Sequence, residues 1–229
     1  MALPVAPMAL PAIDNDNGGQ FTMHHVVDTH VRGKALSVAY TNDPVSMESS
    51  IQTMEQFLAE DKYQVVGFDL EYTIGCVGPD QKVVVTQLCM RHDILVYHYH
   101  LATRPCERFS RFINSSDYSF TKVDTTNNLK ALKVSGLKFP NLVNIQHHYK
   151  VWGSDNNKLN SLVDLASAII DPYYMKMKDE SKKDKNAWHS VWHERLDEQH
   201  VKYAAKDAYT SYDMYRQIVD MRKCLFPAS

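Results

Sequence analysis

This sequence contains little glycine, no large excess of one charge sign and no long apolar run, and each of these features argues against a class of protein. The 229 residues include 8 glycines, about half the average usage, which argues against an enzyme built on a glycine-rich phosphate loop. No window approaches the run of about 18 apolar residues that a membrane-spanning helix requires. The formal net charge of -2 excludes the strongly basic chains that coat nucleic acids in bulk, although it is compatible with a local basic groove.

Paired cysteines are also missing. The four cysteines are scattered without a C-x-x-C pair, which argues against a zinc ribbon and favours thiols buried in the core. The N-terminal segment has no basic residues before its apolar stretch and contains three prolines, so it is not typical of a signal peptide. We therefore expect a protein of a reducing compartment, in the cytoplasm, the nucleus or both, with no membrane partner.

What the sequence does contain is the composition of a folded domain. Hydrophobic residues make up 44% of the chain and charged residues 23%, which excludes extensive disorder. A chain of this length can bury a core without disulfides or structural metals. We expect a flexible N-terminal tail at residues 1–20, ending in the turn-like sequence NDNGG, and a single domain at residues 21–229.

The spacing of apolar residues predicts strands first, then alternating helices and strands, and finally a long helix. One or two strands are expected within 20–40, and others at 63–71, 82–89, 93–99, 118–123 and 142–145. Helices are expected at 44–60, 105–114, 127–134, 159–170 and 197–223. Segment 75–81 is expected to separate the strand at 63–71 from the strand at 82–89. The charged stretch 175–187 is typical of a solvated loop. This order predicts an α/β fold with a mixed central sheet flanked by helices.

Two acidic residues end one of the predicted strands. Because strand side chains alternate, Asp69 and Glu71 share one face of VVGFDLE while Leu70 points to the other. Two carboxylates this close repel each other unless a cation lies between them. The alternative is an ordinary strand end that reaches solvent, and this motif alone does not decide between the two.

A second pair of polar residues lies in the long terminal helix. Positions four residues apart share a helical face, so the Tyr203 hydroxyl and the Asp207 carboxylate are expected to point into one site. The small Ala204 and Ala205 between them let the helix approach the sheet closely. Taken alone, the pattern is equally compatible with an amphipathic helix that carries a surface aspartate.

The two motifs together supply three carboxylates and a phenol. Oxygen ligands of this kind suit Mg²⁺ or Mn²⁺. Two such ions about 4 Å apart stabilise the attacking and leaving oxygens of a phosphodiester displacement. The hypothesis is therefore a metal site formed by Asp69, Glu71 and Asp207, with Tyr203 orienting the attacking water.

At this point the sequence resembles a known family. The segments VVGFDLEYT and YAAKDAYTSYDMY are similar to the first and third motifs of the DEDDy 3′–5′ exonucleases. Within that family the chain looks most like the short plant Werner-syndrome-like exonucleases, which include the RISC-interacting clearing exoribonucleases. The resemblance runs from about residue 65 to 215 and also covers VVVTQLC, LKALKVSGL and NSLVDLASAII.

The resemblance implies a ribonuclease-H-like fold, two divalent cations and removal of nucleotides from the 3′ end of single-stranded RNA or DNA. It also implies a homo-oligomeric ring and, for the plant relatives, RNA-silencing proteins as partners.

One position departs from the family pattern. The second motif of the family has the form V-G-I-x-x-D, and here the corresponding segment 123–128 ends in Asn128. Asparagine keeps the size of aspartate and one oxygen but loses the charge, so it is expected to weaken the second cation rather than the first. Asp124 lies nearby in the sequence and is a candidate to compensate.

Two functions therefore stay open. The first is a metal-dependent 3′–5′ exonuclease that hydrolyses phosphodiester bonds at nucleic-acid 3′ ends. The alternative is a catalytically weak or inactive pseudo-exonuclease that acts as a nucleic-acid-binding or assembly module, because Asn128 occupies the place of the second-motif aspartate. The number of divalent ions that the chain binds would discriminate between them.

Overall fold

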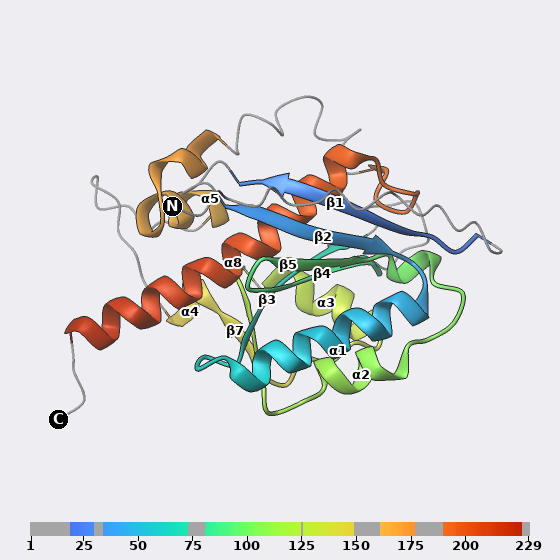
Figure 1. The fold of residues 1–229 in the computed structure, drawn as a ribbon, viewed down its shortest axis with the longest axis horizontal. Coiled ribbons are helices and arrows are strands. Elements are labelled where there is room, and N and C mark those ends of the chain that lie inside the picture. Colours follow the sequence, from blue (N-terminus) through green and yellow to red (C-terminus); the bar gives the residue numbers. More distant parts are fainter. Residues whose placement is uncertain are drawn as a thin grey trace, which may run out of the picture.

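A seven-stranded mixed sheet forms the centre of the molecule (Figure 1). The computed structural model describes residues 19–29, 34–72, 81–124, 126–148, 161–176 and 190–225. The strand order is β1-β2-β5-β4-β3-β6-β7. The strands are β1 (Thr22–Asp28), β2 (Ala35–Thr41), β3 (Val65–Tyr72), β4 (Val83–Met90), β5 (Asp93–Tyr97), β6 (Ser119–Lys122) and β7 (Leu142–Asn144).

Helices cover both faces of this sheet. Helices α1 and α2 pack on one face, and the long α8 crosses the other (Figure 1). The α-helices are α1 (Pro44–Glu60), α2 (Glu107–Ile113), α3 (Thr126–Val134), α4 (Ile145–His148), α5 (Leu162–Ile169) and α8 (Glu198–Leu225). Short 3₁₀ helices lie at Tyr99–Leu101 and Pro172–Lys176. The predicted α/β fold with a mixed sheet flanked by helices is confirmed.

Helix α1 shows why local signals predicted so much of this fold. The carboxylate of Asp43 accepts hydrogen bonds from the backbone N–H groups of Val45 (3.1 Å) and Ser46 (3.0 Å), which caps the helix. Pro44 occupies the first turn, where its missing N–H costs nothing. The buried apolar residues recur every three or four positions: Met47, Ile51, Met54 and Leu58. The observed bounds equal the predicted ones.

The sheet follows the predicted order of strands. Segment 20–40 contains two strands, β1 and β2, which pair antiparallel. Strands β4 and β5 form the predicted antiparallel hairpin, and Arg91 at its turn has a φ of 59°. Strand β3 lies between antiparallel β4 and parallel β6. This central position places the end of VVGFDLE in the middle of the sheet, beneath α8.

Helix α8 lies unusually close to β3 because of a glycine. A Cβ atom at Gly67 would overlap the carbonyl oxygen of Ala208 and the Cβ of Tyr212. Ala204 and Ala205 are fully buried in the same helix, as expected from their small size. The close approach brings the α8 face that carries Asp207 over the carboxyl end of β3.

A few predicted boundaries are wrong or lie outside the described residues. Of the predicted tail at 1–20, only Gly19 and Gln20 are described; Gly19 accepts a hydrogen bond from Asn42 Nδ2 (2.9 Å) and Gln20 donates one to Thr103 (2.8 Å). Strand β7 ends at Asn144, since the next residue already begins α4. Residues 1–18, 73–80, 159–160 and 177–187, on which other expectations fall, lie outside the described part of the chain. Of the cysteines, Cys89 and Cys106 are buried thiols as predicted, whereas Cys224 is exposed. No helix among the described residues is long and apolar enough to cross a membrane.

A buried histidine links the sheet to the segment before α8. His98 Nδ1 and the Tyr40 hydroxyl are hydrogen-bonded at 2.8 Å, and the backbone N–H of Leu196 donates to the same Tyr40 oxygen at 2.8 Å. Burial lowers the pKa of His98 from 6.5 to about 3. The imidazole is therefore neutral in the folded protein at neutral pH.

Replacing His98 by glutamine is expected to make the stability less sensitive to acid. Between about pH 6.5 and pH 3 the unfolded chain protonates His98 and the folded chain does not, so the free energy of unfolding falls as the pH decreases. This histidine contributes a slope of up to about 1.4 kcal/mol per pH unit, which His98→Gln should remove. Urea denaturation at several pH values measures the slope. His24→Gln, at an exposed position of β1, is the control and should keep the wild-type slope. An unchanged slope in His98→Gln would contradict the prediction.

Candidate active site

Three carboxylates act on one another electrostatically where β3 ends beneath α8. Asp69 and Glu71 come from β3, and Asp207 comes from α8, where it is 8% exposed. Burial, together with the charge of Asp69, raises the pKa of Asp207 to about 8. Burial and the charges of Asp69 and Asp207 raise the pKa of Glu71 well above its ordinary value. The three groups therefore act on one another electrostatically, and a cation would relieve their repulsion.

The tyrosine one turn before Asp207 faces the same cluster. The Tyr203 hydroxyl is hydrogen-bonded to the Asp207 carboxylate, whose negative charge raises the pKa of Tyr203 far above its ordinary value. The phenol is therefore a neutral hydrogen-bond donor at all relevant pH values. Its ring packs against that of Trp192, with centroids 6.1 Å apart. The i, i+4 spacing in α8 thus brings Tyr203 and Asp207 together.

A lysine that the sequence analysis did not consider is part of this cluster. The Lys122 ammonium, at the end of β6, forms an ion pair with Asp69 Oδ1. The two side chains are only 6% and 13% exposed. The backbone N–H of Leu70 donates to the same Asp69 oxygen at 2.6 Å. No local pattern indicates this contact, because Lys122 meets Asp69 through the parallel pairing of β6 with β3.

The structure places Asn128 in α3, just after β6. The residue is 7% exposed, and its Nδ2 donates to the backbone carbonyl oxygen of Asp124 at 3.3 Å. Asp124 has a φ of 55°, in the left-handed region that non-glycine residues rarely adopt. Burial and the charge of Glu71 raise the pKa of Tyr72, at the end of β3, and the charge of Asp124 adds to this rise. Asn128 is therefore buried beside the strand that carries Lys122, with its amide directed to backbone.

A second polar residue in this region was also missed. Gln87 of β4 lies directly opposite Asp69 in the register of the sheet, so the two side chains project from the same face. Gln87 is fully buried, and both polar atoms of its amide lack a hydrogen-bond partner among the described residues. Buried polar groups are normally paired, so an unpaired amide here is typical of a place that receives a further group.

The chemistry of these donors fits a divalent cation. Asp69, Glu71 and Asp207 supply hard oxygen ligands, and the unpaired Gln87 amide lies opposite one of them. Their arrangement is not yet that of a metal site, because no group of three or more His, Cys, Asp or Glu side chains in the described part of the chain is gathered to hold an ion. The position against Asp69 is taken by the ammonium of Lys122.

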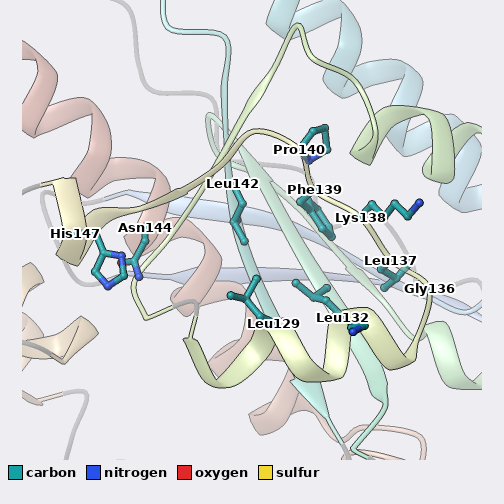
Figure 2. Close-up of a pocket in the computed structure, with 11 residues that line it drawn as sticks. Leu129, Leu132, Gly136, Leu137, Lys138, Phe139, Pro140, Leu142, Asn144 and His147 are labelled. Atoms are coloured by element: carbon teal, nitrogen blue, oxygen red, sulfur yellow. The ribbon is translucent and has the colours of Figure 1, made fainter.

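An apolar cavity of about 550 Å³ lies beside this region (Figure 2). It extends between α3 and the chain leading to β7, and Figure 2 shows Leu129, Leu132 and Leu142 along it, with Asn144 and His147 at one end. Leu129 directly follows Asn128, and Asn144 pairs in register with Lys122. One end of the cavity therefore lies near Asn128 and β7, and the other end is lined by Gly136, Leu137 and Lys138.

The comparison with known families decides the identity of this domain. Residues 41–222, most of the chain, match the 3′-5′ exonuclease family. This chain belongs to the 3′-5′ exonuclease family. Its matched region contains every one of the five predicted site residues, listed as Asp69, Glu71, Asn128, Tyr203 and Asp207. A search of curated protein sequences found no significant match.

Solved structures agree with this exonuclease fold. The EXO domain of Aedes aegypti Nibbler is 14% identical, with a TM-score of 0.56 over 82% of this chain and 89% of that one. Trypanosoma brucei RNase D in complex with GMP is 12% identical, with a TM-score of 0.62 over 80% of this chain and 57% of that one. Escherichia coli RNase D, an exoribonuclease involved in structured RNA processing, is 14% identical, with a TM-score of 0.50 over 76% of this chain and 43% of that one.

These likenesses settle the fold and leave the finer predictions open. The predicted ribonuclease-H-like exonuclease fold is confirmed. The present chain spans about half the length of the two RNase D structures, so the activities of those whole proteins are not transferred to it. Membership of the plant subgroup and the roles of the five site residues stay predictions.

Proposed function

We propose that this chain is a divalent-cation-dependent 3′–5′ exonuclease that removes nucleotides from the 3′ end of single-stranded RNA or DNA. The observation that carries the proposal is the buried cluster of Asp69, Glu71 and Asp207 with the Tyr203 hydroxyl, within a domain of this family. The raised pKa values of Glu71 and Asp207 indicate that their charged forms are unfavourable in the folded protein. A bound cation would stabilise these charges, and a cation site is therefore the function that accounts for them.

Each residue of the cluster then has a distinct task. Asp69, Glu71 and Asp207 would hold Mg²⁺ or Mn²⁺, and Glu71 and Asp207, whose pKa values are raised, would release protons as the ions bind. A bound divalent cation supplies the positive charge that polarises the scissile phosphodiester. The Tyr203 hydroxyl donates its proton in a hydrogen bond to Asp207, and the lone pairs of the phenolic oxygen would accept a hydrogen bond from the attacking water and orient it. Packing against Trp192 restricts the ring to this position.

RNA is the substrate class that we favour. Trypanosoma brucei RNase D, one of the structural neighbours, is described in complex with RNA and with GMP. The apolar cavity beside Asn128 offers a surface on which a nucleobase can pack. A time course on 5′-labelled RNA and DNA, with Mg²⁺ and Mn²⁺ compared, tests the proposal. We expect progressive shortening of linear RNA from its 3′ end, whereas a circular RNA of the same sequence stays intact. No shortening of either nucleic acid with either ion would refute the activity.

A second candidate function is supported by two specific residues. Asn128 is neutral where the family pattern has an aspartate, and Lys122 places a positive charge against Asp69. Both residues disfavour bound cations. We propose as the alternative a pseudo-exonuclease that binds nucleic acid without cleaving it, which would show as binding of labelled RNA in the absence of shortening.

Replacing Asn128 by aspartate is expected to raise the exonuclease rate by an order of magnitude or more. In a partly buried site one added charge near a cation is worth a few kcal/mol at an effective dielectric of about 20, and each 1.36 kcal/mol is tenfold in rate. The measurement is the initial rate on 5′-labelled RNA as a function of Mg²⁺ and Mn²⁺ concentration. The variant should also need less metal for half-maximal rate.

The control for this change adds the same charge far from the cluster. Asn114→Asp, at the exposed end of α2, should leave the rate and the metal requirement unchanged. A fast wild type that is not accelerated by Asn128→Asp would show that Asn128 is not at the position of the missing ligand. Two inert proteins that still bind metal would favour the pseudo-exonuclease.

A ring-shaped homo-oligomer and RNA-silencing proteins as partners are further proposals that rest on the resemblance to the plant relatives. A cytoplasmic or nuclear location is a proposal that rests on the scattered cysteines and the N-terminal sequence. Light scattering of the purified chain tests the homo-oligomer directly.

A further inference from the structure

The Lys122–Asp69 ion pair is a feature of the candidate site that the proposed reaction does not use. Lys122 ends the short strand β6, which pairs in parallel with β3. Its side chain is 6% exposed and its ammonium contacts Asp69 Oδ1, and its positive charge offsets part of the rise in pKa that burial and neighbouring carboxylates cause at Glu71 and Asp207. One ammonium therefore serves all three carboxylates.

Charge balance makes this ammonium a competitor of any divalent ion. A buried charge is tolerated only when it is paired, and here the pairing is supplied from within the chain. A divalent ion bound to Asp69 would lie next to the Lys122 ammonium, because both would contact the same carboxylate. Like charges at that distance repel. The ion can therefore bind Asp69 only if the lysine side chain moves away, or else it binds with an affinity lowered by this repulsion.

We propose that Lys122 is a built-in counter-cation that takes the place of one divalent ion beside Asp69. In the absence of metal it neutralises the cluster and keeps the domain folded. Metal binding then requires its displacement, which lowers the affinity of the site. This inference deepens the proposed function, on whose carboxylate site it rests, and it concerns the metal affinity rather than the cleavage step.

Lys206 is a second lysine whose charge acts on this cluster. It precedes Asp207 in α8 and offsets part of the rise in pKa that burial and Asp69 cause at that carboxylate, but it is half-buried and its effect is smaller than that of Lys122. It therefore offers a matched control, since Lys206→Met removes the same charge from the neighbourhood without removing the ion pair with Asp69.

Calorimetric titration of Mn²⁺ into the wild type, Lys122→Met and Lys206→Met tests the inference. We expect Lys122→Met to bind Mn²⁺ at least tenfold more tightly than the wild type, and Lys206→Met to differ by less than threefold. Thermal unfolding gives a second readout that does not involve cleavage. In EDTA Lys122→Met should melt below the wild type because its carboxylates are unpaired, and saturating Mn²⁺ should raise its melting temperature by more than that of the wild type.

Two provisions keep the test decisive. If Lys122→Met does not fold, Lys122→Gln retains a hydrogen-bond donor for Asp69 while it removes the charge, and the same tightening is expected. Equal Mn²⁺ affinity in the wild type and the folded Lys122 variant, or equal gains in both lysine variants, would overturn the inference.

The RNA assay separates this inference from the proposed function. Tighter Mn²⁺ binding without any shortening of RNA would uphold the role of Lys122 and refute the nuclease activity. Shortening of RNA by the wild type, combined with an unchanged metal affinity in the Lys122 variant, would uphold the activity and refute the role of Lys122.

Discussion

Replacing Asp207 by asparagine is expected to weaken Mn²⁺ binding by about 10²–10³-fold and to lower the exonuclease rate at least as much. The substitution keeps the size of the side chain and removes its charge. One unit charge about 4 Å from another contributes about 4 kcal/mol at an effective dielectric of about 20, and each 1.36 kcal/mol is a factor of ten. Asp207 takes up a proton at neutral pH and must release it to bind metal. The free energy of this deprotonation reduces the electrostatic gain from the charge, and this sets the lower limit of the expected loss in Mn²⁺ affinity.

The same variant should gain stability while it loses function. Asp207 is 8% exposed and its pKa is raised to about 8, so the metal-free protein either buries a charge or holds a proton there. Since the folded carboxyl binds its proton more tightly than the unfolded one, its contribution to stability is lost as the pH rises from about 4 to about 8. Asparagine carries neither cost, so Asp207→Asn should melt higher than the wild type in EDTA at about pH 8.

Asp213→Asn is the matched control for this prediction. Asp213 lies in the same helix and is 7% exposed, but it acts on Cys89 and His92 rather than on the carboxylate cluster. Its Mn²⁺ affinity should equal that of the wild type. Equal affinity in Asp207→Asn and the wild type would remove Asp207 from the metal site.

Replacing Tyr203 by phenylalanine is expected to lower kcat by about 10²–10⁴-fold with little change in KM. An interaction made mainly in the transition state affects kcat without affecting the binding of substrate. The expected loss in kcat has the size typical of general acid–base catalysis, because the hydroxyl would orient the water that loses its proton as it attacks. The measurement is the concentration dependence of the initial rate on RNA.

The control for this change is Tyr209→Phe in the same helix. Tyr209 is 2% exposed and its ring stacks on that of His92. The Tyr209→Phe substitution therefore removes an identical hydroxyl at a position away from the carboxylates. Its kcat should stay at the wild-type value. An unchanged kcat in Tyr203→Phe would show that Tyr203 serves only to pack against Trp192.

Residues close together in the sequence carried most of what was predicted correctly. The bounds of α1 follow from the Asp43 cap and the spacing of four buried apolar side chains, which are local features of the chain. The same holds for the pair Tyr203 and Asp207, because a helix alone fixes positions four residues apart on one face. The alternation of a strand likewise placed Asp69 and Glu71 together.

Boundaries were less predictable where packing decides them. Gly19 and Gln20 look like part of a polar tail, yet hydrogen bonds to Asn42 and Thr103 hold them against the domain. Both partners are distant in the sequence, so no local pattern indicates the contact. The strand predicted to end at residue 145 likewise stops one residue earlier, where α4 begins.

The sequence by itself determined the α/β fold, the family, and the carboxylates and tyrosine of the candidate site, because each depends on periodicity or on a short motif. Only the tertiary structure decided what surrounds them. Lys122 lies 53 residues from Asp69 and meets it because β6 pairs with β3 in parallel. Asp207 reaches the cluster because Gly67 lets α8 lie close to the sheet. Contacts of this kind depend on which elements pack together, and no single segment of the chain encodes that choice.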